Sequence, residues 1–481
     1  MIVDRIDRAL GNGIERAICL HHHRRLRKVG WERALDPPND GPYCQGDPPP
    51  REGCSLEVLI DGENALPAMA EAIKNAQSHV HIAGWHVSPD FKLERGDGAR
   101  PLRDLLGDVA SRLPVRVLLW AGAPLPVFNP PRRRVREVRD ALCEGTEIHC
   151  ALDRREHLMH CHHEKLVVVD DEVAFVGGID MTELSGDRFD HNDHPPRRAL
   201  GWHDAASRLR GPIVTDVAEH FAFRWREVTG ERLRPPSEPR PGGEQTVQLV
   251  RTVPQGVYDG LPDGDYRILE AYIRALKSAQ HLIYLENQFL WSPEIIEVLS
   301  EKLRHPPNDD FRLVVLLPVH PNNGADVTRG MAGELAAVDD GGHRFLACSV
   351  YAADESGKPT PVYVHAKIGI VDDRWLTLGS ANLNERSLFN DSEVNVVTDD
   401  ATLARRTREE LWAEHLEVPV DEISGRPHDE LIDERWRPLA AEQLERRERG
   451  EPLTHRLVEL PNVSKRARRL LGPLESFAVD G

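Results

Sequence analysis

Two short segments of the chain combine a histidine, a lysine and an aspartate at the same spacing, H-x-K-x4-D. The residues are His163, Lys165 and Asp170 in the first segment and His365, Lys367 and Asp372 in the second. Each pattern reaches a pair of small residues after the same further distance. Only nine of the 481 residues are lysine, so one such pattern should arise by chance only ~0.03 times in this composition. The repetition indicates one site built from two halves.

Paired histidines and lysines suit the cleavage of a phosphodiester. A neutral imidazole can attack phosphorus, and a protonated one can donate to the leaving oxygen near neutral pH. An ammonium beside each imidazole holds the non-bridging oxygens as the pentavalent transition state forms. This chemistry needs no metal and no cofactor, and we expect neither. Each imidazole also needs a partner that fixes its tautomer, and the candidates are Asp204 for one half and Glu393 for the other.

The chain repeats the elements that must position these groups. Each H-x-K-x4-D segment is itself predicted to be a strand, since it contains an apolar run at 166–169 or 368–371. Strand alternation puts its histidine and lysine on one face. Upstream, each half reads helix, strand, helix, strand. The ranges are 68–78, 80–85, 102–113 and 115–120 in the first half and 268–279, 282–286, 294–304 and 313–317 in the second. We predict a duplicated α/β domain, one copy per half.

A stretch rich in proline and glycine near the middle of the chain separates the two copies. We expect five segments. They are an N-terminal extension (1–55), a first domain (56–233), a linker (234–244), a second domain (245–420) and a C-terminal extension (421–481) that carries a helix at 439–449. Neither extension carries a readable chemical motif.

Composition limits the classes of function. The formal charge of −18 repels polyanions, so nucleic acid is an unfavourable partner unless a local basic groove overrides it. Mean hydropathy is negative, and no apolar run is long enough to cross a bilayer. The N-terminus lacks the apolar core of a secretion signal, and the seven cysteines form no C-x-x-C pair. We therefore expect a cytoplasmic protein with reduced thiols, peripheral at the membrane if it contacts one.

Two histidine clusters invite other interpretations. His157, His160, Cys161 and His162 precede the first motif, but their spacing fits neither a zinc finger nor a helical pair, and we expect polar lining of the pocket. The run His21–His23 stands in a basic patch. We expect a solvated helix face there, with attraction to anionic lipid as the alternative.

The motifs and their surroundings resemble the phospholipase D superfamily, over roughly 56–416. The segments that carry the resemblance, besides the two motifs, are Gly84-Trp85 with Pro89, Gly177–Asp180, Arg188–Asp190, Trp202–Asp204, His220-Phe221, Arg224-Trp225, Tyr284–Phe289, Gly379–Leu388 and Asp391–Glu393. The resemblance implies two mixed-sheet α/β domains packed face to face with the site at their seam. It also implies a covalent phosphatidyl-histidine, released by water or an alcohol.

The same resemblance implies the residue roles. His163 would be the nucleophile and His365 the general acid that later serves as base. Lys165 and Lys367 would bind the phosphate, together with Asn382. Asp180 stands where many relatives have Asn, so we expect it to be an acceptor for lysine or a structural residue. Asp170 and Asp372 belong to the catalytic motifs, and we expect them to hold the turn of their own motif.

The function implied is a phospholipase D that converts glycerophospholipids to phosphatidic acid, with transfer to alcohols as a side reaction. A phospholipid is the expected partner, through transient contact with a membrane surface. The sequence leaves the oligomeric state open, with a monomer as one option. Three alternatives stay open. They are a cardiolipin or phosphatidylserine synthase, a nuclease or other phosphodiesterase, and a non-catalytic scaffold that retains the fold.

Overall fold

The structure is a computed structural model, and it describes residues 2–96, 98–124, 129–157, 160–182, 202–237, 240–321, 325–353 and 358–460. The first half contains β1 (Arg51–Ile60), α2 (Asp61–Asn75), β2 (Val80–Gly84), α3 (Leu102–Ala110), β3 (Val115–Trp120), α4 (Arg132–Cys143), β4 (Ile148–Asp153), β5 (Leu166–Val169), β6 (Val173–Gly177), β7 (Trp202–His203), β8 (Ala205–Arg210) and α5 (Ile213–Thr229).

The second half contains β9 (Gln245–Val253), β10 (Asp265–Tyr266), α6 (Arg267–Ser278), β11 (Leu282–Glu286), α7 (Pro293–Arg304), β12 (Arg312–Leu316), α8 (Ala325–Asp339), β13 (Phe345–Ala353), β14 (Pro359–Pro361), β15 (Tyr363–Val364), β16 (Ile368–Val371), β17 (Trp375–Gly379), α9 (Glu385–Phe389), β18 (Glu393–Thr398) and α10 (Ala401–Leu416). Flanking these are α1 (Ile2–Lys28), α11 (His428–Leu431), α12 (Arg437–Glu448) and β19 (Leu457–Glu459).

The strand pairings show the duplication directly. In the first half the order is β4-β3-β2-β5-β6-β8-β1, and in the second it is β13-β12-β11-β16-β17-β18-β9. In both, the first three strands are parallel and the rest antiparallel. β1 also pairs with β9, which joins the two sheets. The predicted duplicated α/β fold is confirmed.

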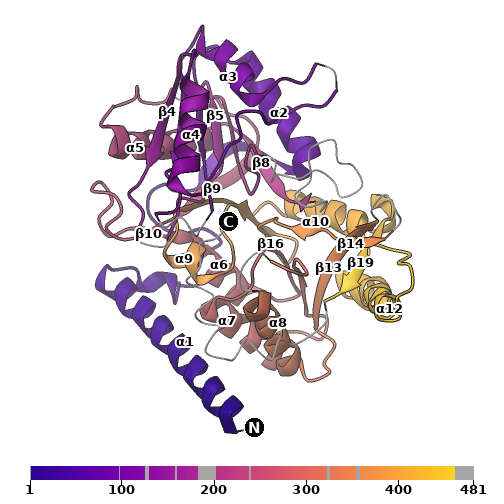
Figure 1. Cartoon of the computed structure of the whole chain (residues 1–481). Helices are drawn as coiled ribbons and strands as arrows, with labels where there is room; N and C mark the ends of the chain where they lie inside the picture. The colour runs from indigo at the N-terminus through magenta and orange to yellow at the C-terminus, as the bar shows by residue number, and fades with distance from the viewer. Residues whose placement is uncertain are drawn as a thin grey trace.

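Helices cover the outside of each sheet, and the two sheets share an inner core (Figure 1). One apolar cluster joins α2, α3 and α4 to the first sheet, and another joins α6, α7 and α8 to the second. A third cluster contains residues of both sheets together with α5 and α10. The motif strands β5 and β16 are buried at every position, which explains their continuous apolar runs. The predicted packing of the two copies against each other is confirmed.

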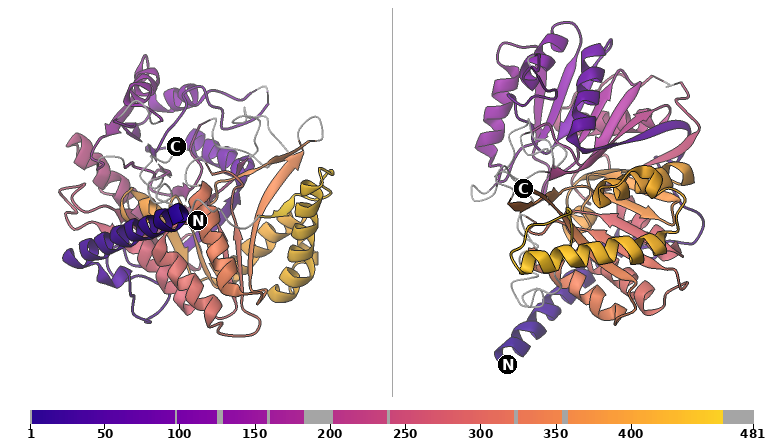
Figure 2. Two further views of the ribbon diagram at one scale, coloured as in Figure 1. Left: turned by 60° about the horizontal axis from the view of Figure 1, so that its bottom comes forward. Right: turned by 90° about the vertical axis from the view of Figure 1, so that its right-hand side faces the viewer.

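The C-terminal extension is integrated into the second half. Its strand β19 pairs with β13, and the fully buried Trp436 packs edge-on against Trp412 and Tyr284. We still propose the division at 234–244, because within each half the central strands come from one side of it. By contrast, the N-terminal end of α1 extends away from the body of the molecule (Figures 1 and 2).

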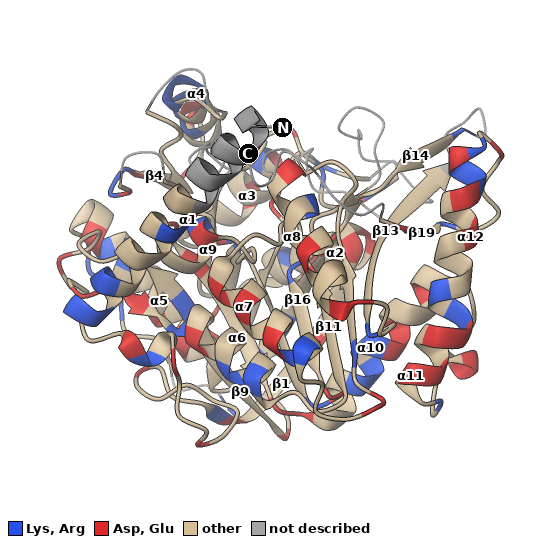
Figure 3. Ribbon diagram, turned by 90° about the horizontal axis from the view of Figure 1, so that it is seen from below, with Lys and Arg blue, Asp and Glu red and all other residues tan. Residues whose placement is uncertain are grey.

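The outer helices carry charges of both signs. Along α10 and α12, acidic and basic residues are interspersed (Figure 3), and Arg446 of α12 pairs with Glu442 one turn earlier. Among the residues that the structure describes, no helix combines the length and the apolar character needed to cross a bilayer.

Candidate active site

Short pairings between the two halves position both motif histidines. Before the first motif, His162 bridges to Ser392 in parallel, and the backbone N–H of His163 donates to the Ser392 carbonyl at 2.9 Å. Before the second motif, β15 pairs with β7 in parallel, and the N–H of His365 donates to the carbonyl of His203 at 2.7 Å. Each histidine is therefore aligned beside a segment from the opposite half.

As a result, each motif histidine contacts a carboxylate from the opposite half. The Nδ1 atom of His163 lies 3.1 and 3.2 Å from the two carboxylate oxygens of Glu393, which belongs to the second half. The Nδ1 atom of His365 lies 2.6 Å from Oδ2 of Asp204, which belongs to the first. Both predicted carboxylates thus contact a motif histidine, each across the seam. In both pairs Nδ1 is the ring nitrogen that contacts the carboxylate.

The carboxylates are themselves held firmly. Ser380 and Ser387 donate their hydroxyls to Glu393 at 2.5 and 2.6 Å. Asp204 accepts the N–H of Ala205 at 2.8 Å. A Cβ atom added to Gly178 would stand 2.1 Å from Oδ1 of Asp204, so the small residue after the first motif is required by this close approach.

Burial sets the protonation of these carboxyls. Burial raises the pKa of Asp204 to about 7, although Lys367 and Lys165 oppose the shift. Burial likewise raises the pKa of Glu393 to about 8, although Lys165 and the two serine hydroxyls oppose it. Both lysines therefore lie near enough to Asp204 to act on it, which brings cations from the two halves to one place.

We predict that Glu393 makes the protein less stable as pH rises. Between about pH 4.5 and about 8, the folded protein keeps a proton on this carboxyl that the unfolded chain releases, so its contribution to stability falls across that window. Urea unfolding of the wild type and of Glu393→Gln at several pH values measures this. The free energy of unfolding should fall more steeply with pH in the wild type, and parallel slopes would contradict the assignment.

The two lysines have different neighbours. Lys165 Nζ lies 3.0 Å from Oδ2 of Asp180, so Asp180 is an acceptor for lysine, one of the two roles expected for it. Lys367 Nζ donates to Oε1 of Gln288 at 3.3 Å, and Nδ2 of Asn382 donates to the same oxygen at 3.3 Å. Each lysine also donates to the carbonyl of its own motif histidine. The two motif lysines therefore have chemically different neighbours.

Sequence reasoning did not single out Gln288 as a site residue. Gln288 directly follows the end of β11, where Asn287 and Gln288 are buried polar residues after a buried strand. Its Nε2 donates to the hydroxyl of Tyr363 at 2.8 Å, two residues before His365. The sequence signal that could have identified Gln288 is its place among polar residues directly after a buried apolar strand.

A buried imidazole next to Asp204 was also missed. His203 Nδ1 lies 3.0 Å from Asp61, and its Nε2 lies 2.7 Å from Glu286. Burial disfavours the charged form, but the two carboxylates raise the pKa of His203 well above its ordinary value. Asp61 also accepts the backbone N–H of Asp204 at 2.9 Å, so this network supports the partner of His365 from behind.

The motif aspartates lie at the other end of the motif strands from the histidines. Asp170 accepts the backbone N–H groups of Gln77, Ser78 and His79 at 2.6–2.9 Å. In the second half, Asp372 does the same for 280–282 at 2.7–2.8 Å. We therefore propose a structural role for both, in place of their inclusion with the catalytic residues. They hold not only their own turn but also the segment that leads into β2 or β11.

We predict that removing either aspartate costs stability rather than chemistry. Asp170→Ala and Asp372→Ala should each lower the free energy of unfolding by about 2–4 kcal/mol, because three N–H groups lose a charged acceptor. Both positions have positive φ, so Asp→Asn is the matched control that tolerates this backbone. Activity per folded molecule should stay within a few-fold of the wild type. A large loss of kcat in folded protein would restore a catalytic role.

In the histidine-rich segment before the first motif, Cys161 and His162 are buried and contact other parts of the protein. His162 is 1% exposed and lies between Ser392 Oγ at 2.9 Å and Asp153 at 3.1 Å. Cys161 is buried and donates its N–H to Asp391. These side chains face different partners and do not converge on one point.

The tryptophans separate into two groups that the sequence did not distinguish. Trp85 lies edge-on to the ring of His163 at 6.5 Å, and Trp202 lies 4.9 Å from the ring of His365. Trp225 stacks on Phe221 within the inner core. One tryptophan thus stands beside each motif histidine. The expected Arg188–Asp190 segment lies outside the described residues.

Several known proteins are similar to this chain in sequence or in fold. The family model described as "Cardiolipin synthase, PLD-like domain" matches residues 272–414. The chain is similar to phospholipase D A of Dictyostelium discoideum, with 26% identity over 80% of this chain and 37% of that protein. It is also similar to phospholipase D alpha 1 of Cynara cardunculus, with 26% identity over 82% of this chain and 72% of that protein. The chain thus spans little more than a third of the Dictyostelium protein.

Among solved structures, phosphatidylserine synthase from Haemophilus influenzae Rd KW20 aligns over 84% of this chain and 96% of that one, with a TM-score of 0.54 and 13% identity. At that identity the likeness shows a shared fold. The doubled His–Lys pattern, the family model and these relatives support an enzyme of the phospholipase D type. The family model and these relatives support a place for the chain in the phospholipase D superfamily.

Proposed function

We propose that the protein is a phospholipase D. It would hydrolyse the distal phosphodiester of glycerophospholipids such as phosphatidylcholine to phosphatidic acid, with transfer to alcohols as a side reaction. The observation that carries the proposal is the pair of crossed histidine–carboxylate contacts, His163 with Glu393 and His365 with Asp204. Relatives named phospholipase D support the choice of substrate class.

In the proposed reaction, Nε2 of His163 attacks phosphorus while the bond to the head-group oxygen breaks. That oxygen takes a proton from Nε2 of His365. Water or an alcohol then gives a proton to His365 and bonds to phosphorus, and the phosphorus–His163 bond breaks. Lys165 and Lys367 offset the charge on the non-bridging oxygens through both steps, and Asn382 offers an amide donor to the same group.

The two motif lysines have different neighbours. Beside Lys165 stands the carboxylate of Asp180, whereas Lys367 and Asn382 share the neutral amide of Gln288. Both lysines also lie near enough to Asp204 to act on its carboxyl.

Vesicles of phosphatidylcholine supplied with ethanol test the proposal. Purified protein should form phosphatidic acid together with phosphatidylethanol, and His163→Asn should form neither. Absence of both products with the wild type would end this assignment.

A phosphatidyltransferase is the second candidate, because the matching family model is described as a cardiolipin synthase domain. The chemistry differs only in the acceptor, which would be a lipid alcohol. Incubation with phosphatidylglycerol should then yield cardiolipin faster than phosphatidic acid. Degradation of single-stranded DNA in the presence of a chelator would instead favour a nuclease.

A further inference from the structure

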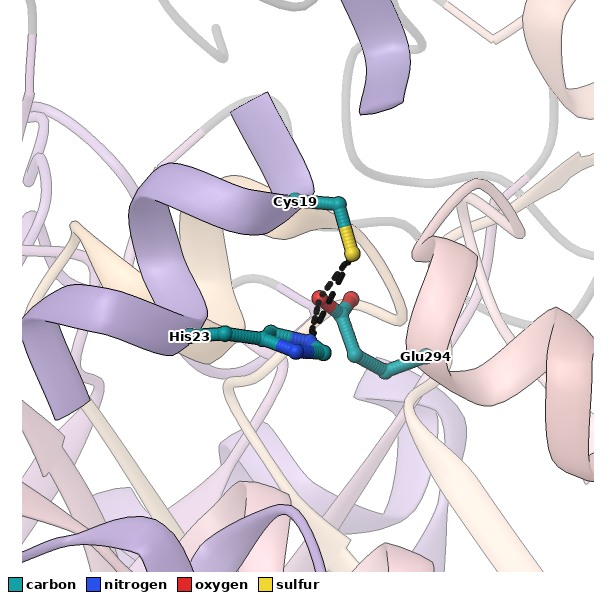
Figure 4. A group of neighbouring side chains, drawn as sticks. All are labelled: Cys19, His23 and Glu294. Atoms are coloured by element: carbon teal, nitrogen blue, oxygen red, sulfur yellow. Dashed lines mark hydrogen bonds and ion pairs between the residues drawn. The ribbon is translucent and has the colours of Figure 1, made fainter. Parts of the chain in front are cut away.

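Three side chains that the proposed reaction does not use meet between the N-terminal helix and the second half. Cys19 and His23 come from α1, and Glu294 comes from the first turn of α7. Figure 4 shows the three side chains pointing toward one another. Glu294 lies 275 positions after Cys19 and 271 positions after His23, so only the fold brings it to them.

Their ligand atoms form a compact triangle. Cys19 Sγ lies 3.4 Å from Nε2 of His23 and 3.4 Å from Oε1 of Glu294, and Nε2 lies 3.1 Å from the same oxygen. Around a tetrahedral zinc ion, sulfur, nitrogen and oxygen ligands at their usual bond lengths stand about 3.3–3.6 Å apart. The triangle therefore already has nearly the dimensions of one face of a zinc tetrahedron.

The arrangement is built from rigid elements. Cys19 and His23 are four residues apart on a helix, which places them on one face one turn apart. Glu294 is buried, and its second oxygen accepts the hydroxyl of Ser292 at 2.9 Å, which orients the first oxygen toward the helix. A hydrogen bond of this kind is a common support for a metal-binding carboxylate.

The surroundings carry excess negative charge. Glu297 and Glu385 both lie near enough to act electrostatically on Cys19. The Glu385 side chain is 9% exposed, and its Oε1 has no hydrogen-bond partner among the described residues. Glu385 also interacts electrostatically with Glu294. Buried carboxylates gathered in this way are costly unless a cation joins them.

We propose that Cys19, His23 and Glu294 form a binding site for a divalent transition metal, best suited to zinc. Thiolate, imidazole and carboxylate are the three ligand types that zinc takes in proteins. The fourth position would be filled by water or by the unpartnered carboxylate of Glu385. Calcium and magnesium do not fit, because they take all-oxygen ligand sets.

Metal binding at this site would fix α1 against the second half. Next to it, the ring of His22 stacks on Phe389 of α9 at 4.5 Å, and Arg25 donates to the Phe389 carbonyl and to Asn390. The expected solvated basic face of α1 is therefore partly packed against the protein. The same α9 carries Ser387, which donates to Glu393, the partner of His163. Metal binding would thus order a helix that supports the candidate active site from outside.

Zinc alone tests the proposal on the full chain. Protein stripped of metal, loaded with zinc and freed of excess should retain about one zinc per chain by elemental analysis. Cobalt in place of zinc should give the visible bands of a tetrahedral ion and a near-ultraviolet thiolate charge-transfer band. Cys19→Ser should abolish the charge-transfer band, and His23→Gln and Glu294→Gln should weaken zinc binding by at least ~100-fold.

Two matched controls isolate the site. Cys143→Ser changes another partly exposed cysteine, and His21→Gln changes a neighbouring histidine of the same helix. Both should bind zinc and cobalt as the wild type does. Hydrogen exchange adds a readout that needs no variant: zinc should slow exchange in 19–28 and 385–389. Failure of the wild type to retain zinc, or equal binding by Cys19→Ser and Cys143→Ser, would overturn the proposal.

Discussion

A His163→Asn variant is expected to lose on the order of 10⁴-fold or more in kcat for a phosphodiester substrate. The reason is that no other group is proposed to form the bond to phosphorus. His365→Asn should lose a similar factor on phosphatidylcholine, because the head-group oxygen is a poor leaving group without its proton. With natural lipid the two variants would look alike, so a second substrate is needed to separate their roles.

A phosphodiester with a nitrophenol leaving group makes that separation. Nitrophenolate leaves without a proton, so His365→Asn should still complete the first step and release a burst of nitrophenolate equal to the enzyme present. The intermediate should then persist, because His365 is also the base for its hydrolysis, and intact-protein mass spectrometry should find the adduct on His163. An adduct on His365 in the His163→Asn variant would reverse the assignment.

The second prediction concerns the crossed carboxylates. Asp204→Asn and Glu393→Gln should each lower kcat by about 10²–10⁴-fold, because each leaves one imidazole without the group that orients it. The crossing makes the two variants distinguishable. Asp204→Asn, although it lies in the first half, should behave as an acid variant and recover burst formation with the nitrophenyl substrate. Glu393→Gln, in the second half, should not recover it.

Asp170→Asn is the matched control for this comparison, since it neutralises a carboxylate of the first motif that contacts backbone N–H groups and no motif histidine. Asp170→Asn should retain both the formation of the intermediate and its hydrolysis. If Asp204→Asn slowed the burst as strongly as Glu393→Gln does, the crossed assignment of attacking and donating histidines would be wrong. Stability of each variant by urea unfolding shows whether a loss reflects chemistry or unfolding.

Local sequence predicted the central strands well and the edges of the fold less well. The predicted ranges 166–169, 368–371 and 282–286 agree with β5, β16 and β11. These strands are buried on both faces, so their apolar runs are continuous and end sharply. By contrast, α2 begins at Asp61 instead of 68, because its first turn contains the polar residues Asp61 and Asn64, which do not show helical apolar spacing.

The long-range pairings were out of reach for local reasoning. The pairing of β1 with β9 and that of β19 with β13 join segments from distant parts of the chain. β1 is partly exposed and β19 is short, so their apolar patterns are weak. Sequence periodicity reports which face of an element is buried, but not which neighbour covers it.

For the candidate site, the sequence alone determined the reacting groups. In the doubled H-x-K-x4-D pattern the histidine and lysine are two positions apart, so in an extended segment both side chains of a pair face the same way. It also named Asp204 and Glu393 as the carboxylate partners. These conclusions follow from residue type and local geometry, which the chain carries without its tertiary contacts.

Only the tertiary structure decided which partner serves which histidine. The bridges of His163 to Ser392 and of His365 to His203 cross the seam, so each carboxylate orients the imidazole of the other half. The same folding placed Gln288 beside Lys367 and Glu294 beside Cys19. A contact between residues far apart in sequence depends on how whole elements pack, because no local pattern encodes the distance between them.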